Sequence, residues 1–313
     1  MMNEKFYRYT TTYGRKVINK FEKIHKSDRK YKLFYKYINA LLKEDFKKID
    51  SNSFKYQNVN KRIPFRFWIM WWQGIDNNTP EIISKNIKNI ENILGEENVV
   101  LITKFNYKEY TNIPNNILNK VNEGKIDLTS FSDIIRFNLL RNKGGYWIDS
   151  TVIISPTFKE YIRNNESNYF FSLCESQKNY HNISYNQWTI WLMGGVPHYR
   201  LFEYVCNFYN NYFNNHETII DYFLTDDIIS HFYNITPEFK DDCERFKKNW
   251  RPYYWSENFN KKYDVQMINK FNDVLEYSVQ KLTYKFNETL LKNKDNLLCH
   301  IFTYLNSWEN KND

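Results

Sequence analysis

The chain of 313 residues carries a formal net charge of +8, and 42% of its residues are hydrophobic, which is enough for one large α/β core. No apolar run approaches the ~20 residues of a membrane-spanning helix. The N-terminus lacks the apolar stretch of a signal peptide, so we expect a cytosolic protein. The cysteines form no CxxC pair, which argues against a disulfide framework and a cysteine zinc site; they are Cys174, Cys206, Cys243 and Cys299.

The positive charge is concentrated near the N-terminus. Residues 1–62 hold 17 Lys and Arg against 6 Asp and Glu, whereas residues 63–313 hold 27 against 30. Apolar residues recur at helical spacing among lysines and predict a helix over about residues 15–49; they are Leu33, Phe34, Tyr37, Ile38, Leu41 and Leu42. We therefore divide the chain into a basic helical arm with a linker, 1–62, and a main domain, 63–313.

The arm has two compatible interpretations. A basic amphipathic helix can lie on an anionic membrane surface. It can equally pack on the main domain and leave its basic face in water. No nucleic-acid-binding motif accompanies the charge, so we expect no nucleic-acid partner.

The main domain begins with a strand–helix–strand pattern. A short apolar run over residues 65–72 predicts a buried strand, and Pro80 and Gly95 bracket a helix with apolar residues at helical spacing. A second buried strand follows at residues 98–102. The short return predicts a parallel βαβ unit.

The later pattern continues the α/β alternation. It predicts a helix over about 132–142, a strand over 146–154, strands at 169–173 and 188–193, and helices at about 199–213 and 219–233. Neither a GxGxxG nor a GxxxxGK[ST] loop occurs, which argues against a dinucleotide enzyme and a P-loop NTPase. The middle third therefore predicts a nucleotide-binding α/β sheet.

The candidate chemistry lies between residues 132 and 151. Asp133 and Arg136 are three residues apart and share one helix face. Gly144 and Gly145 permit a sharp turn and a close approach to a ligand. Asp149 interrupts the apolar strand and needs a partner there. Because Mg²⁺ and Mn²⁺ take oxygen ligands and bridge to phosphates, a metal ion is the natural candidate.

These residues carry a family resemblance. Ser132-Asp133-x-x-Arg136 and Gly144-Gly145-x-x-x-Asp149 resemble the sugar-binding DXD region of glycosyltransferases with the GT-A fold. The nearest group is the capsular polysaccharide synthesis group, related to family 32. The resemblance extends to the Ile63–Gly74 segment and to Asp221-Tyr222-Phe223, and covers roughly residues 63 to 235. It implies a GT-A type nucleotide-binding mixed sheet flanked by helices.

The resemblance also implies roles for individual residues. Trp71 would border the uracil, and Gln73, Gly74 and Gly145 would line the nucleotide. Asp133 would hydrogen-bond the ribose or donor sugar, and Arg136 would touch the sugar or the diphosphate. Structural roles stay open for each: a core aromatic for Trp71, a first-turn acid for Asp133 and an ion-pair partner for Arg136.

The metal would be Mn²⁺ or Mg²⁺, bound by Asp149 with Thr151. The family pattern is usually D-x-D, whereas here Asp149-Ser150-Thr151 supplies a neutral oxygen in the third position. A C-terminal ligand, from His300 or from residues 306–308, could complete the site. Acceptor contacts could come from Glu175, Gln187, Asp226, Asp227 and the Gly194-Gly195 pair.

We therefore expect a retaining, metal-dependent hexosyltransferase at the cytoplasmic face of the membrane. It would move galactose, ahead of glucose or N-acetylglucosamine, from a UDP-sugar to a lipid-linked capsule or cell-surface polysaccharide intermediate. One alternative is a degenerate, non-catalytic protein that binds sugar nucleotides or glycans, which Thr151 would favour. Another is a polybasic membrane-docking protein whose activity lies in residues 1–62.

Overall fold

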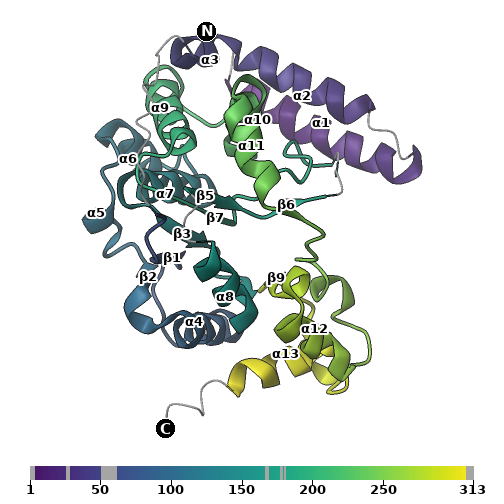
Figure 1. Ribbon diagram of the computed structural model, residues 1–313. Coiled ribbons are helices and arrows are strands. Elements are labelled where there is room, and N and C mark those ends of the chain that lie inside the picture. The colour runs from purple at the N-terminus through teal and green to yellow at the C-terminus, as the bar shows by residue number, and fades with distance from the viewer. Residues whose placement is uncertain are drawn as a thin grey trace.

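A mixed five-stranded sheet forms the centre of the computed structural model, which describes residues 4–25, 29–50, 62–165, 169–176, 179 and 181–307. Its order is β2 (Val99–Ile102), β1 (Phe67–Met70), β3 (Gly145–Ile148), β7 (Leu192–Gly195) and β5 (Phe170–Ser172). The first three strands are parallel, and β7 runs antiparallel to both β3 and β5. Helices flank this sheet (Figure 1), so the chain is an α/β protein with a mixed central sheet.

The predicted parallel unit at the start of the main domain is confirmed. Strand β1 leads into α4 (Glu81–Leu94), whose Ile83, Ile87 and Ile90 are buried, and β2 returns beside β1. Pro80 precedes the helix, and Gly95 ends it with φ +94°, a conformation that favours glycine.

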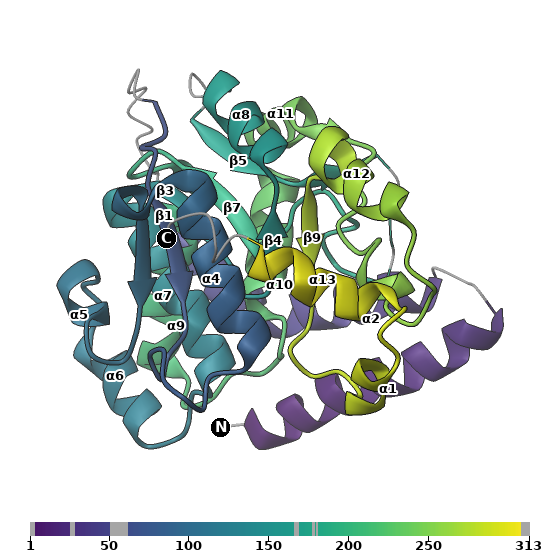
Figure 2. The same cartoon turned by 90° about the horizontal axis from the view of Figure 1, so that it is seen from below.

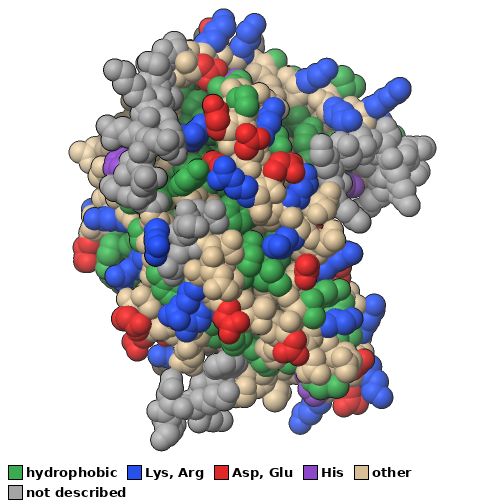
Figure 3. Space-filling view, in the orientation of Figure 1, with side chains coloured by type: hydrophobic (Ala, Val, Ile, Leu, Met, Phe, Trp, Pro, Cys, Tyr) green, Lys and Arg blue, Asp and Glu red, His purple; other side chains and the backbone are tan. Residues whose placement is uncertain are grey.

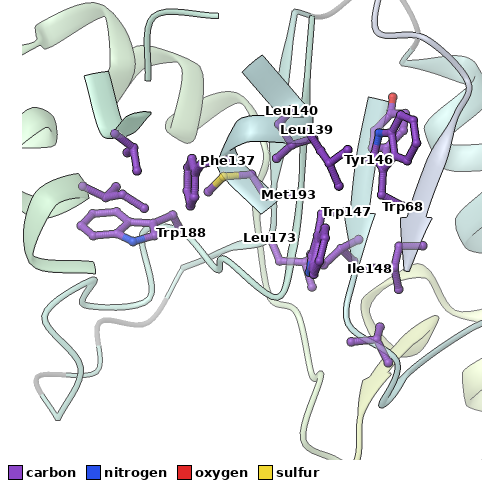
Figure 4. Close-up of a cluster of buried hydrophobic side chains, with 14 of the residues drawn as sticks. Trp68, Phe137, Leu139, Leu140, Tyr146, Trp147, Ile148, Leu173, Trp188 and Met193 are labelled. Carbon is purple, nitrogen blue, oxygen red and sulfur yellow. The ribbon is translucent and has the colours of Figure 1, made fainter. Parts of the chain in front are cut away.

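The predicted helix at 132–142 is longer than expected. Helix α7 spans Leu128–Lys143 and begins one residue after Asp127, whose carboxylate accepts a hydrogen bond from the Ser130 amide. It packs on α9 (Arg200–Asn215). Figure 4 shows side chains of α7, among them Phe137 and Leu139, in one buried cluster with Trp147 of β3.

The single strand predicted over residues 146–154 is wrong. Strand β3 ends at Ile148, residues 149–151 make a turn closed by the Val152 amide on the Asp149 carbonyl at 2.9 Å, and β4 (Val152–Ile154) follows. Strand β4 pairs antiparallel with β9 (Val279–Lys281) in a separate two-stranded sheet. Asp149 thus stands at the end of a strand and does not interrupt it, because a turn keeps its carboxylate out of the apolar core.

Two other bounds differ from prediction. The expected strand at 188–193 is β7, which pairs with its neighbours through Gly194 and Gly195. These positions require glycine, because an added Cβ would lie 2.4 Å from the Tyr146 side chain at Gly194 and 2.6 Å from the Phe202 side chain at Gly195. The expected helix at 219–233 is α10 (Leu224–Ile235).

The remaining elements of the main domain are α5 (Tyr107–Tyr110), α6 (Asn115–Asn122), α8 (Pro156–Asn164), β6 (Cys174–Glu175), α11 (Pro237–Arg245), β8 (Lys247–Lys248), α12 (Val265–Asp273), α13 (Leu297–Asn306), and the short 3₁₀ helices η1 (Glu96–Asn98), η2 (Ser256–Asn258), η3 (Leu275–Tyr277) and η4 (Glu288–Lys292).

The N-terminal segment forms three helices where one was predicted over 15–49. They are α1 (Glu4–His25), α2 (Arg29–Leu41) and α3 (Lys43–Asp50); α3 packs on α9, α2 packs on α10, and α1 packs on α2 (Figures 1 and 2). Phe34 and Ile38 of α2 join the main core. Arg15 bonds the buried Asp221 carboxylate at 2.6 Å. The predicted linker lies almost wholly outside the described residues.

Within the described ranges, no helix combines the length and the apolar character needed to cross a membrane.

Candidate active site

An open cleft of about 370 Å³ lies at the carboxyl ends of β1 and β3. The segment after β1 and the turn after β3 supply two of its walls, and the first half of α7 supplies a third. Lys281, the last residue of β9, and Tyr284 just after it complete the lining. Its lining comprises Met70, Trp71, Trp72, Gln73, Leu128, Thr129, Ser132, Asp133, Arg136, Trp147, Asp149, Ser150, Thr151, Lys281 and Tyr284. Ligands of open α/β sheets bind at this edge.

Asp149 is the most highly connected carboxylate of the cleft. Its Oδ1 accepts from Arg136 at 3.0 Å and from the Trp147 indole at 2.8 Å, and its Oδ2 accepts from the Lys281 ammonium at 2.7 Å. Burial alone would raise its pKa, but Lys281 and Arg136 together hold the pKa of Asp149 at about 2. The group is therefore an anion at neutral pH.

Arg136 joins the two acids that the sequence singled out. Its guanidinium bonds Asp133 on one side and Asp149 on the other, and it lies over the Trp147 ring at 4.8 Å. Its side chain is only 5% exposed. Although burial opposes the charge, Asp133 and Asp149 raise the pKa of Arg136 above its ordinary value. Both acids thus share one buried cation.

Asp133 is also held from a second helix. Its Oδ2 accepts a hydrogen bond of 2.8 Å from the hydroxyl of Thr225 on α10, and the Tyr209 hydroxyl lies 2.6 Å from the same threonine oxygen. Asp133 is therefore fixed in two directions, which orients a carboxylate for ligand binding.

The expected nucleotide-binding residues fall into two groups. Trp71 and Gln73 line the cleft, and the Trp71 ring meets the Tyr284 ring edge-on at 5.6 Å. Gly74 and Gly145 do not line it. Gly74 closes the turn with its amide 3.0 Å from the Trp71 carbonyl, and its φ is +83°.

Gly145 is constrained by the sheet. A Cβ at this position would lie 2.5 Å from the Arg66 carbonyl oxygen, and the residue has φ +91°. Its close approach is therefore to Arg66, directly before strand β1, which accounts for Gly145 as a packing requirement. A contact between Gly145 and nucleotide stays a prediction.

The side-chain oxygens of Asp149 and Thr151 do not fit a divalent cation, because both already accept hydrogen bonds from a lysine. Lys281 Nζ bridges them, 2.7 Å from Asp149 Oδ2 and 2.8 Å from Thr151 Oγ1. The part of the chain that the structure describes contains no cluster of three or more His, Cys, Asp or Glu side chains suited to a metal. His300 stacks on Tyr263 at 3.7 Å and is not among the residues that line the cleft. Trp308 is outside the described residues.

Sequence reasoning missed Lys281, Tyr284 and Thr225. None belongs to a short motif, and Lys281 follows Asp149 by 132 residues. The one available signal was that the Asp149 carboxylate requires a partner, and this signal does not say which residue the partner is.

A second cavity of about 160 Å³ adjoins the cleft at Trp191, whose carbonyl accepts the Asp149 amide at 2.9 Å. Trp188, Trp191 and Tyr253 supply aromatic walls, and Glu175 and Asp226 supply carboxylates. Burial raises the pKa of Glu175 to about 7 and that of Asp226 to about 6. Of the other predicted acceptor contacts, Gln187, Asp227, Gly194 and Gly195 are buried and are not among its lining residues.

Comparison with known proteins gives one family. The model of a family described as capsular polysaccharide synthesis protein matches residues 14–301. The match includes most of α1, all of α2 and α3, and strand β9 with Lys281. No curated protein matches the chain, and no solved structure does.

Proposed function

The chain belongs to the capsular polysaccharide synthesis protein family, and from this we propose that it is a glycosyltransferase of the GT-A type. It would move a hexose from a UDP-sugar to a lipid-linked saccharide intermediate of a capsule or cell-surface polysaccharide. One observation carries the proposal: Asp133, Arg136 and Asp149 meet in one bonded cluster at the carboxyl ends of the parallel strands of the mixed sheet.

The cleft offers complementary groups for each part of such a donor. The half-buried Trp71 presents a flat ring to a base, and Gln73 adds an amide beside it. Asp133, held by Thr225, is suited to accept from sugar hydroxyls. Arg136 is nearly fully buried, so it would act mainly by holding both acids in place.

The proposed chemistry retains configuration at the anomeric carbon. The bond from this carbon to the diphosphate oxygen breaks, and its electron pair stays on the diphosphate. The acceptor hydroxyl oxygen bonds to the same face of the sugar, and its proton passes to the diphosphate. Positioning and electrostatic stabilisation are then the protein's main contributions, and no separate carboxylate base is required.

The second cavity is our candidate for the acceptor saccharide. Sugars bind to aromatic faces and to carboxylates that accept hydrogen bonds from their hydroxyl groups. Trp191 and Tyr253 meet at 6.2 Å on one side, and Asp226 bonds the Trp188 indole at 2.9 Å on another. Thr225 and Asp226 are consecutive residues that face the cleft cluster and the cavity respectively, which supports a shared reaction centre.

The N-terminal helices support docking at an anionic membrane surface. Aromatic and apolar side chains stand exposed on α1 and α2: Phe6, Tyr9, Tyr13, Phe21, Leu33 and Tyr37. Exposed lysines of both helices accompany them, including Lys16, Lys20, Lys32 and Lys36. Figure 3 shows Lys and Arg side chains gathered along the edge where these helices lie. We propose a peripheral location on the inner face of the membrane.

A degenerate, non-catalytic binding protein is the alternative, and Thr151 is the feature that favours it. Titration calorimetry with UDP, UDP-galactose, UDP-glucose and UDP-N-acetylglucosamine tests the shared donor site. We expect one UDP-sugar to bind, with affinity reduced in Trp71→Ala and Asp133→Asn and preserved in the surface control Asp273→Asn. Equal affinity in all four proteins would contradict the assigned cleft. Turnover, treated below, separates the enzyme from the binding protein.

A further inference from the structure

The cation that lies between Asp149 and Thr151 is a side chain of the protein itself, Lys281. Lys281 Nζ donates to Asp149 Oδ2 at 2.7 Å and to Thr151 Oγ1 at 2.8 Å, so it occupies the position between these two side chains. These are the two residues that stand at the ends of the Asp149-Ser150-Thr151 motif. An ammonium group has three N–H donors. Two are used in these contacts, and the third is available to a ligand in the cleft that Lys281 lines.

The backbone fixes Lys281 in this position. Lys281 pairs with Val152 across the β4–β9 sheet, and the next amide, of Leu282, donates to the Thr151 carbonyl at 2.9 Å. The neighbouring Gln280 side chain is buried and donates to the Arg251 carbonyl at 2.9 Å. The lysine is thus held by strand pairing directly beside the motif and is only 20% exposed.

Thr151 fits an ammonium better than it fits a metal. A divalent cation gains most from a second carboxylate, which Thr151 does not supply. An ammonium needs only an acceptor lone pair, and a hydroxyl oxygen provides one.

The two cations would also exclude each other. A divalent ion bound about 2.1 Å from Asp149 Oδ2 would lie within about 5 Å of a lysine that is 2.7 Å from the same oxygen. At that separation like charges repel by several kcal/mol in a partly buried site.

We propose that Lys281 supplies the positive charge that a divalent cation supplies at a D-x-D motif, and that it contacts the diphosphate of the donor. This inference rests on the proposed function. When the bond between the anomeric carbon and the diphosphate breaks, the electron pair moves onto the diphosphate oxygen, and Lys281 stabilises the negative charge that develops there. Donor binding then proceeds in the presence of a chelator.

The test measures affinity for UDP and for uridine by titration calorimetry, in EDTA and in Mn²⁺. The variants are Lys281→Met, which keeps the length of the side chain, Lys281→Arg, which keeps the charge, and Lys285→Met as a control. Lys285 is an exposed lysine four residues along the chain that is not among the residues lining the cleft. Circular dichroism confirms that each variant is folded.

We expect wild type and Lys285→Met to bind UDP equally well in EDTA and in Mn²⁺. Lys281→Met should lose about tenfold or more in EDTA, as expected for one charge-assisted hydrogen bond, and regain part of it in Mn²⁺ because Asp149 is then open to the metal. Lys281→Arg should retain most of the affinity. Uridine, which has no phosphate, should bind all four proteins alike.

Two results would overturn the inference and leave the proposed function standing: UDP binding by wild type only in Mn²⁺, or wild-type affinity of Lys281→Met in EDTA. A third result has a different meaning. If folded wild type binds neither uridine nor UDP in either buffer, the proposed function fails, and the inference fails with it.

Discussion

Lys281 Nζ lies 2.7 Å from Asp149 Oδ2 although 132 residues separate the two in sequence. The contact joins the end of the central strand β3 to strand β9 of the small sheet. The C-terminal part of the chain therefore completes the site that the middle part begins. With Arg136 on its other oxygen, Asp149 is held by two cations.

Arg136→Met should destabilise the fold. The substitution removes the one guanidinium that Asp133 and Asp149 share, and leaves two largely buried carboxylates without it. Removing one partner of a buried ion pair costs about 3–5 kcal/mol, which urea denaturation would measure. Arg163→Met, at an arginine outside this cluster, serves as the control. A loss below about 1 kcal/mol would show that the cluster contributes little to stability.

Gly145→Ala should also destabilise the protein, for a reason of backbone geometry. The new Cβ would lie 2.5 Å from the Arg66 carbonyl oxygen at a φ of +91°. We expect a loss of about 2 kcal/mol or more from strain and displacement of β1. Gly124→Ala is the matched control, since φ is +70° there with nothing within 4 Å, and should cost about 1 kcal/mol. Equal losses in the two variants would contradict the packing role of Gly145.

Glu175→Gln should change the pH dependence of stability. Burial raises the pKa of Glu175 to about 7 from its ordinary 4.5. Between these values the folded chain binds more protons than the unfolded chain, so this group's contribution lowers the free energy of unfolding as pH rises. The amide removes that contribution. The melting temperature of the variant relative to wild type should therefore increase from pH 5 to pH 8. A difference that stays constant with pH would contradict the burial effect, and Glu160→Gln makes the same change at an exposed position as the control.

Charge reversal on α2 should weaken membrane docking. Lys32 and Lys36 are exposed, and each basic residue near an anionic surface contributes about 1 kcal/mol. The double variant Lys32→Glu/Lys36→Glu should co-sediment less with phosphatidylglycerol vesicles than wild type does. Lys88→Glu/Lys143→Glu makes the same charge change at exposed sites on other helices. Unchanged sedimentation of the α2 variant would rule out docking through this face. Point substitutions are needed because deleting α1 to α3 would remove residues of the core, such as Ile38 of α2.

Local patterns predicted the elements whose signals are local. The sequence of the βαβ unit around α4 has two apolar runs for the strands, a proline before the helix and a glycine after it. The two strands and the helix are formed as these signals predict. The division between β3 and β4 was not predictable from hydrophobicity, because Tyr146–Ile148 and Val152–Ile154 are equally apolar and differ only in their sheet partners. The N-terminal helices likewise pack on partners far away in the sequence, α3 on α9 and α2 on α10, which their own sequence pattern does not indicate.

The candidate site was predictable in part for a similar reason. Asp133 and Arg136 share a helix face by spacing alone, and they are bonded as that spacing indicates. The need of Asp149 for a partner followed from the cost of burying a carboxylate. The identity of the partner did not, since strand pairing brings Lys281 to it from the far end of the chain. Membership of the family was indicated by the motifs and is confirmed over residues 14–301.

The central claim is that this cleft transfers a sugar, and the most direct measurement is release of UDP from a panel of UDP-sugars. Wild type, Asp149→Asn and the exposed control Asp273→Asn would be compared with and without Mn²⁺. We predict that wild type and the control release UDP from one UDP-sugar, and that Asp149→Asn is slower by about 10²-fold. Release by Asp149→Asn at the wild-type rate, or no release from any donor by folded wild type that binds UDP, would contradict the account.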